Sequence, residues 1–243
     1  MNTLRFARLA SGLLALGAAL DLSAQVVFTA NGTYSQNFDT IPFSPGSQLT
    51  WTDNSTLAGW YVSDHSYGSF EGVGTPVGTN LYVYSATAGS TDLALGSHTR
   101  SDGANSIFYG LKLLNNTGHA LDAVSLSFSV ENYRSGAWVE DVLTASFGFN
   151  NAGLELGTWN SLASLNAFSG NVTLSLPLTW NDGDSLWIRW EDSVLSAGTN
   201  PKNAGFALDN FSVTAIPEPS TYALILGVAT LGLVGFRRWR AQR

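Results

Sequence analysis

The central part of the chain alternates hydrophobic and polar residues over short stretches. In residues 123–130, Val124, Leu126, Phe128 and Val130 are separated by serines. Because successive residues of a β-strand point to opposite faces of a sheet, this pattern predicts a strand with one buried face. The same pattern predicts strands over residues 107–114, 142–149, 172–176, 185–191 and 206–214, and shorter ones over residues 26–30, 59–63 and 81–85.

Segments rich in Asn, Asp and Gly separate the predicted strands. The clearest are residues 115–118, 150–153 and 181–184, which supply side chains that tolerate the positive φ angles of tight turns. Residues 68–78 are rich in glycine and are expected to form a surface loop. Many short strands between such turns predict an all-β fold, a single antiparallel β-sandwich of the jelly-roll type over residues 25–215.

The start of the chain has a different pattern. Arg5 and Arg8 precede an apolar stretch over residues 9–20, which is followed by a short segment ending at Ala24. A basic segment, an apolar segment of this length and a small residue before the cleavage point are typical of a secretory signal peptide. We therefore expect a helical signal peptide over residues 1–24, export by the Sec machinery, and a mature chain that begins at Gln25.

The end of the chain, residues 216–243, is apolar and then basic. Residues 222–236 carry no charge, and a transmembrane helix is expected over residues 220–236. A helix that crosses a membrane needs about 20 apolar residues, so this short run favours transient anchoring in the inner membrane. Basic residues beside a membrane segment stay on the cytoplasmic side. The basic end, residues 237–243, therefore predicts a cytoplasmic C-terminus and a sandwich outside the cytoplasm.

Pro217, Glu218 and Pro219 stand between the predicted sandwich and the apolar run. Proline fixes φ and has no backbone donor, so this triplet is expected to be an extended and exposed spacer. The triplet, the following Ser-Thr pair, the short apolar run and the terminal arginines together resemble the PEP-CTERM sorting tail of bacterial proteins. That tail is also labelled the C-terminal region of ice-binding proteins.

The resemblance covers only residues 216–243, and it implies partners. An exosortase, which is a membrane protease-transpeptidase, would recognise Pro217, Glu218 and Pro219. The arginines that would retain the chain in the membrane until processing are Arg237, Arg238 and Arg240. The processed chain would then belong to the cell envelope, the cell surface or the extracellular matrix. The alternative is an ordinary membrane anchor with a proline-rich lead.

Several segments of the centre resemble uncharacterised secreted β-sandwich modules that are common in proteins with this tail. The segments are residues 37–39, 51–60, 93–97, 110–118 and 207–211. This resemblance supports the predicted fold and implies no activity.

Composition excludes several classes of function. The net charge is −7, and most of the basic residues lie in the two terminal segments, so the centre is strongly acidic. An acidic surface repels phosphate backbones, and no nucleic-acid partner is expected. The chain has no cysteine, so disulfides, thiolate nucleophiles and cysteine zinc sites are excluded.

Motifs for hydrolysis are not found in the sequence. The three histidines are scattered, and neither a Gly-x-Ser-x-Gly elbow nor a His-Glu-x-x-His zinc motif occurs. The adjacent carboxylates 140–141 and 191–192 would point to opposite faces of a strand, so neither pair forms a catalytic couple. We therefore expect a protein that is not an enzyme.

Calcium is the one cofactor that the sequence suggests. Asp182 and Asp184 crowd a turn, where oxygen ligands can converge, although the same residues are ordinary turn formers. Asp209 alternates in step with Phe211 and Val213, so regular alternation predicts that it points into the core. A buried carboxylate needs a partner. Arg189, backbone amides and a structural calcium ion are the alternatives.

Aromatic residues suggest a site for sugars, because aromatic faces stack on sugar rings. The candidates are Trp60, Tyr61, Tyr82, Tyr84, Tyr133 and Trp138. Trp187 and Trp190 would lie on opposite faces of one strand, so at least one of them is expected in the core. No regular threonine array occurs on a repeat, which argues against an ice-binding surface.

The leading hypothesis is an exported, non-catalytic protein of the cell surface or the extracellular matrix, sorted through its tail. The alternative is a carbohydrate-binding module for exopolysaccharide or another glycan. An enzyme that acts on polysaccharides is the third hypothesis.

Overall fold

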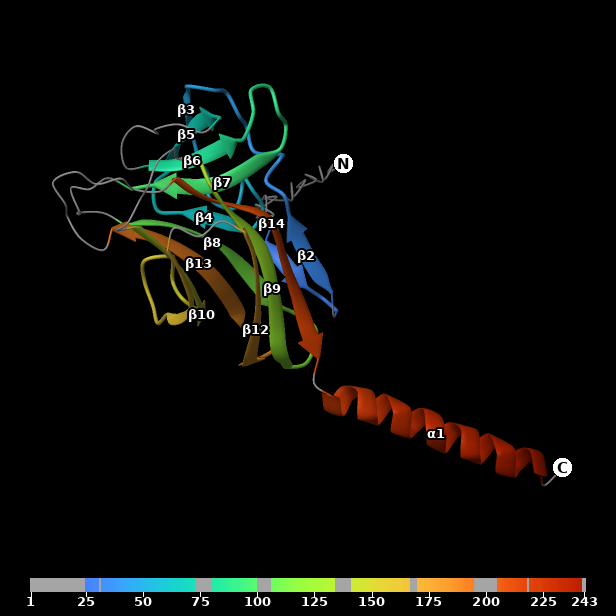
Figure 1. Ribbon diagram of the computed structural model, residues 1–243. Coiled ribbons are helices and arrows are strands. Elements are labelled where there is room, and N and C mark those ends of the chain that lie inside the picture. Colours follow the sequence, from blue (N-terminus) through green and yellow to red (C-terminus); the bar gives the residue numbers. More distant parts are fainter. Residues whose placement is uncertain are drawn as a thin grey trace, which may run out of the picture.

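Two β-sheets pack face to face in the computed structural model, and one helix projects from them (Figure 1). The structure describes residues 25–30, 32–72, 80–99, 106–133, 141–166, 170–194, 205–217 and 219–241. The predicted signal peptide and Trp138 lie outside these ranges.

The smaller sheet has six strands. Its order is β1 (Val26–Phe28), β8 (Ile107–Asn115), β13 (Ser185–Val194), β10 (Asp141–Phe149) and β11 (Asn160–Asn166), and β4 (Trp60–Val62) also pairs with β8. The centre of this sheet is the antiparallel trio β8, β13 and β10, which are longer than the strands at either edge.

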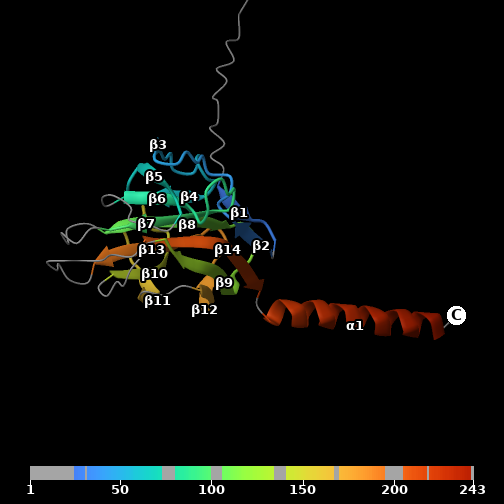
Figure 2. The same ribbon diagram turned by 45° about the horizontal axis from the view of Figure 1, so that its top comes forward.

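The larger sheet has eight strands. Its order is β12 (Gly170–Trp180), β9 (Leu121–Asn132), β14 (Gly205–Pro217), β7 (Leu93–His98), β6 (Asn80–Ser85), β5 (Ser66–Glu71) and β3 (Gln48–Thr50), and β2 (Thr33–Gln36) also pairs with β14. Figure 2 shows β14 leading toward the helix.

The structure confirms the predicted all-β, two-sheet sandwich, and every stretch predicted as a strand lies at least partly in one. The expectation of wholly antiparallel sheets is wrong, because β1 pairs with β8 and β5 pairs with β6 in parallel. The jelly-roll connectivity stays a prediction.

The glycine-rich loop expected over residues 68–78 is wrong for its first part. Gly68 belongs to strand β5, and a Cβ atom at this position would lie 2.4 Å from the Tyr82 ring. The glycine is therefore required by close packing inside the sheet rather than by a turn. Gly72, which follows the strand, does have a positive φ of 79°.

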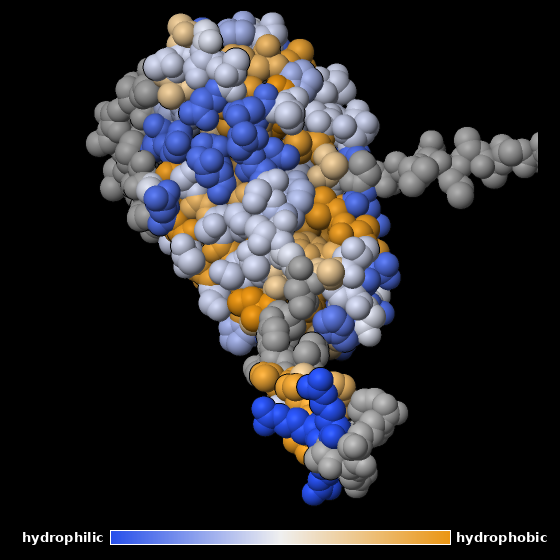
Figure 3. Space-filling model, turned by 90° about the vertical axis from the view of Figure 1, so that its right-hand side faces the viewer, coloured by the Kyte–Doolittle hydropathy of each residue, from blue (hydrophilic) through white to orange (hydrophobic). Residues whose placement is uncertain are grey.

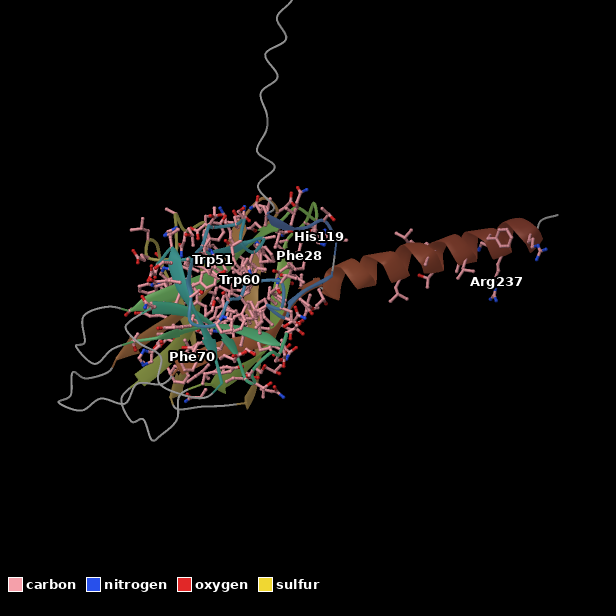
Figure 4. All side chains as sticks on the ribbon, turned by 90° about the horizontal axis from the view of Figure 1, so that it is seen from above. Phe28, Trp51, Trp60, Phe70, His119 and Arg237 are labelled. Atoms are coloured by element: carbon pink, nitrogen blue, oxygen red, sulfur yellow. The ribbon has the colours of Figure 1, made fainter. Side chains whose placement is uncertain are left out.

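Large aromatic side chains fill the space between the sheets. Trp60 and Trp190 stack with ring centroids 5.9 Å apart, and the Phe211 ring meets each of them edge-on at 5.6 Å. Trp60 and Trp190 belong to the six-stranded sheet, and Phe211 belongs to the other, so these contacts join the layers. Figure 4 shows Trp60 inside the body of the molecule. The Trp60 indole also donates to the Tyr34 hydroxyl at 3.0 Å.

A buried carboxylate also links the two sheets. Asp192 of β13 is fully buried and accepts hydrogen bonds from the hydroxyls of Ser97, at 2.7 Å, and Thr99, at 3.5 Å. Its neighbour Glu191 points the other way and accepts from Ser106 Oγ at 3.0 Å. These two carboxylates lie on opposite faces, as the alternation predicts.

Helix α1 (Pro219–Ala241) follows β14 and extends away from the sandwich (Figures 1 and 3). Six of its described apolar side chains are more than half exposed, and these are Leu226, Val228, Leu231, Leu233, Val234 and Phe236. Among the described residues, no helix has the length and hydropathy of a membrane span. The transmembrane helix expected over residues 220–236 is thus not supported, because its uncharged run is short and interrupted by glycines.

Replacing Trp190 by alanine should lower the free energy of unfolding more than any substitution on the surface. Trp190 is fully buried and contacts four other aromatic rings, so the cavity should cost about 3–5 kcal/mol of unfolding free energy. Chemical denaturation followed by fluorescence measures this loss. Leu156→Ala is the control, because Leu156 is 63% exposed and its loss should change stability by less than about 0.5 kcal/mol. Equal losses in the two variants would contradict the described core.

Candidate binding cleft

A cleft of about 400 Å³ lies on the outer face of the six-stranded sheet, and we call it the Tyr61 cleft. Strands β4, β8 and β13 each contribute one side chain to its floor, which are Tyr61, Lys112 and Trp187. These residues point outward because their neighbours along each strand, such as Trp60 and Ile188, fill the core. Alternation along three paired strands therefore builds the floor.

The floor of the Tyr61 cleft is aromatic. The Tyr61 and Trp187 rings lie 4.8 Å apart at an angle of 57°. The Lys112 ammonium lies 5.3 Å from the centre of the Trp187 ring. Tyr61 is partly exposed, whereas Trp187 is 2% exposed. Burial raises the pKa of the Tyr61 hydroxyl, and the nearby Asp53 charge adds to this effect, so the hydroxyl is a neutral donor at physiological pH.

One wall of the cleft is the connection between β10 and β11. Asn150 has a positive φ of 53°, and its side-chain oxygen accepts from the Ser185 backbone N–H at 2.9 Å. Asn151 closes the connection, since its side chain donates to the Thr158 carbonyl at 3.1 Å and accepts from the Thr158 N–H at 3.2 Å. The two asparagines thus fix both ends of the wall.

Arg189 holds the middle of this wall against the sheet. Its Nη1 donates to the Leu154 carbonyl at 2.7 Å. The guanidinium lies 4.1 Å from the Trp159 ring centre and 4.8 Å from that of Phe108. Burial lowers the pKa of Arg189, and the Glu191 and Glu155 carboxylates oppose that effect.

A glycine makes room for the wall. Gly110 of β8 faces outward between Tyr61 and Arg189. A Cβ atom there would lie 2.9 Å from the Leu154 side chain and 2.4 Å from the Ile188 carbonyl oxygen. Only glycine therefore lets Leu154 lie flat against the strand.

The opposite wall carries an acid and a histidine. Asp53 Oδ1 accepts from the Val62 N–H at 3.1 Å, and its Oδ2 lies 3.3 Å from His65 Nε2. Ser63 accepts from the Phe108 N–H at 3.0 Å, which leaves its own hydroxyl hydrogen available. The cleft therefore combines an aromatic floor with hydrogen-bonding groups along one side.

The aromatic candidates from the sequence fall into different places. Trp60 is part of the core, and Tyr61 lines the cleft. The predicted opposite orientation of Trp187 and Trp190 is found, but Trp187 is not among the site residues predicted from the sequence. Its place on the outer side of an alternating strand was the signal that could have identified it.

The remaining described candidates, Tyr82, Tyr84 and Tyr133, form a separate cluster on the outer face of the eight-stranded sheet. Tyr84 and Tyr133 stack at 4.7 Å, and each of the three is at most 6% exposed. They therefore do not present open faces for stacking. Tyr82 also lines a second hollow of about 420 Å³ with Gln48, Asn80 and Phe70. Figure 4 places Phe70 well apart from Trp60.

The three aspartates proposed as calcium ligands do not form one site. Asp182 accepts from the Gly118 N–H at 2.8 Å, and Asp184 accepts from Asn150 at 2.9 Å and Asn181 at 3.1 Å, so both serve the turn after β12. Asp209 lies far from this turn. It pairs with Ser129 on β9, whereas Trp180, which is next to the turn, pairs with Leu121, eight residues earlier on the same strand. That separation is roughly 26 Å along the strand. No group of three metal-binding side chains occurs in the described ranges.

Asp209 does not point into the main core, and the expected orientation is wrong. The register between β14 and β9 shifts after Asp209, and Asn210 has a φ of 50°. This bulge places Asp209 on the outer face with Ala207, whereas Phe211 beyond it faces the core. The carboxylate accepts from the Asn210 backbone N–H at 2.6 Å and from its side-chain amide at 2.7 Å. Arg189 is not its partner and lies on the other sheet.

The two prolines of the sorting triplet belong to regular elements rather than to a separate spacer. Pro217 is the last residue of β14 and pairs with Leu121, beyond a register shift. A proline is compatible with a strand end because no ladder bond is needed from its nitrogen there. Pro219 begins α1, and Glu218 lies outside the described residues. Arg237, Arg238 and Arg240 are exposed near the far end of α1, where Figure 4 labels Arg237.

Comparison with known proteins gives similarities in structure alone. No family model and no curated protein matches the sequence. The CBM22-1 xylan-binding domain of Paenibacillus barcinonensis Xyn10C is 14% identical, with 79% of this chain and 99% of that domain covered and a TM-score of 0.42. The carbohydrate-binding module TmCBM27, whose structure concerns mannan recognition, is 8% identical, with 70% and 95% covered and a TM-score of 0.31. These values relate to the sandwich fold and carry no argument about function.

Asp209 should make stability depend on pH. Burial raises its pKa from 3.8 to about 6, so between these values the folded chain keeps a proton that the unfolded chain has lost. Its contribution to stability is therefore present below about pH 4 and is lost as the pH rises through 6. The difference in unfolding free energy between the natural chain and Asp209→Asn should change by about 1–3 kcal/mol over this window. Parallel pH profiles for the two chains would contradict the buried acid.

Proposed function

We propose that the protein binds a glycan at the Tyr61 cleft without chemical conversion. The observation that carries this proposal is the partly exposed Tyr61 ring, which packs on the buried Trp187 ring and has polar side chains beside it. Sugar rings have apolar C–H faces that stack on aromatic rings, while their hydroxyls need hydrogen-bond partners. The cleft supplies both kinds of contact within a space suited to a few sugar units.

The polar side of the cleft suits neutral hydroxyl groups. Ser63 has a hydroxyl hydrogen to donate, and the Tyr61 hydroxyl is also a donor. Asp53 is held by the Val62 amide and by His65, so its orientation is fixed before a ligand arrives. A prearranged site avoids part of the entropy cost of binding.

A polysaccharide-active enzyme is the competing proposal, because Asp53 and Glu155 both line the cleft. A binding role is favoured by the contacts of these residues. Both Asp53 oxygens are already engaged, and Glu155 lies in the exposed wall, where it interacts with the Arg189 charge. Incubation with a bound oligosaccharide followed by chromatography decides between them, since shortened products would establish an enzyme.

We further propose that the protein is exported and presented outside the cell, sorted through residues 216–243. Support comes from α1, which extends from the end of β14 with exposed apolar side chains and a basic end. Large exposed apolar surfaces mark contacts with other molecules. In this proposal the Sec machinery exports the chain, the membrane holds α1 temporarily, and an exosortase processes the tail. The glycan would then be an exopolysaccharide of the envelope or matrix.

Replacing Tyr61 by alanine should weaken glycan binding by about tenfold, which equals about 1.4 kcal/mol. The full chain in detergent is first tested on a glycan array, and the best ligand is then titrated by calorimetry. Tyr61→Phe is the matched control, because it keeps the ring and should lose less affinity. Gln48→Ala tests the second hollow. Loss of binding in Gln48→Ala, with full binding in Tyr61→Ala, would place the site there and reject the Tyr61 cleft.

Replacing both Pro217 and Pro219 by alanine should stop processing of the tail in cells. The double variant should accumulate in the membrane fraction at its unprocessed mass, because the recognised triplet is gone. Immunoblots of cell fractions and intact-mass measurement give the readout. A variant that is processed and located like the natural chain would rule out sorting through this triplet.

A further inference from the structure

Lys112 brings an unneutralised positive charge to the floor of the Tyr61 cleft. In the described part of the chain its ammonium forms no ion pair with a carboxylate, and it lies 5.3 Å from the centre of the Trp187 ring. Arg189 is the only other described lysine or arginine on this face of the sheet. Its guanidinium is held beneath the wall by the Leu154 carbonyl and by two aromatic rings. Lys112 is therefore the cation that can meet a ligand.

The carboxylates around the cleft have other partners. Asp53 accepts from the Val62 amide and lies against His65. Glu155 interacts with the Arg189 charge, as does Glu191 on the same strand as Arg189. Each acid thus has a positive or hydrogen-bonding partner, whereas the Lys112 ammonium has no carboxylate partner among the described residues and lies over an aromatic ring.

The backbone fixes the position of Lys112. Its N–H donates to the Gly59 carbonyl at 2.8 Å on one side of β8, and it is paired directly with Trp187 on the other. Tyr61 is paired with Gly110, two residues away on the same face. The ammonium is therefore presented beside the Tyr61 and Trp187 rings in the same cleft.

We propose that the Tyr61 cleft selects a glycan that contains a uronic acid, with the uronate carboxylate bound by Lys112 and the sugar ring stacked on Tyr61. This inference rests on the proposed function. A single carboxylate fits one ammonium, whereas a densely sulfated chain would meet Asp53, Glu155 and a protein of net charge −7. Repulsion of this kind selects against polyanions of high charge density.

The test uses pairs of polysaccharides that differ only at the carboxylate. Galacturonan, glucuronan and mannuronan are each titrated against the full chain in detergent before and after carboxyl reduction, which converts uronates into neutral hexoses. Neutral glucans, xylans and mannans and a sulfated glycan complete the panel. The strongest ligand should be a uronate polymer, and carboxyl reduction should weaken its binding at least about fivefold. Binding of the unreduced polymer should also weaken as the salt concentration rises.

Variants connect this preference to Lys112. Lys112→Gln should bind the uronate polymer and its reduced form equally, whereas Lys112→Arg should keep the preference. Arg238→Gln is the matched control, because it removes the same charge at an exposed position on α1 and should leave the preference unchanged.

The results separate a failure of the uronate preference from a failure of glycan binding at the Tyr61 cleft. A neutral or sulfated glycan as the strongest ligand, or a uronate preference that survives in Lys112→Gln, overturns this inference. The proposed function then still stands if Tyr61→Ala weakens the binding that remains. No binding to any member of the panel, or binding that Tyr61→Ala leaves intact, overturns both.

Discussion

The stacking of Trp190 between the two sheets is the contact on which the rest of the structure depends. The chain has no cysteine, so no disulfide joins the layers. Trp60, Tyr109, Phe128 and Phe211 surround the Trp190 ring from both sheets. Because side chains alternate along β13, fixing Trp190 inside forces Trp187 and Arg189 outside. The packing of the core thereby creates the floor of the cleft and the support for its wall.

The cleft also needs precise contacts outside the core. Arg189 can reach the Leu154 carbonyl only because Gly110 lets the wall approach the sheet. Asn150 and Asn151 then fix its ends through bonds to Ser185 and Thr158. A wall tied at several points can hold a ligand without large rearrangement, which suits a binding site that is formed in advance.

The sequence predicted the strands whose two faces differ. Strand β9 is the clearest, since its apolar residues are buried while its serines lie on the outer face. Strands β2, β3, β5, β7 and β11 were not predicted. All six residues of β7 are buried, so it has no alternation to detect, and Gly68 made β5 look like a loop. Alternation reports one covered face and cannot recognise a strand covered on both.

The candidate site was predictable only in part. Alternation placed Tyr61 and Trp187 on outward faces, but whether an outward face is open depends on segments distant in the chain. Tyr84 and Tyr133 are outward too, yet they cover one another and are buried. The predicted orientation of Asp209 is wrong because a bulge at Asn210 shifts the register of the strand. A bulge leaves no clear pattern in the sequence.

The most direct measurement is an NMR titration of the indole N–H signals of the eight tryptophans with the glycan that binds best. The Trp187 signal should shift with saturation, because its ring packs against Tyr61 and Lys112 in the cleft, while the signals of Trp60 and Trp190, which lie between the sheets, should stay in place. A Trp187 signal that stays unchanged while the glycan is bound would contradict the claim that the outer face of the six-stranded sheet binds the glycan.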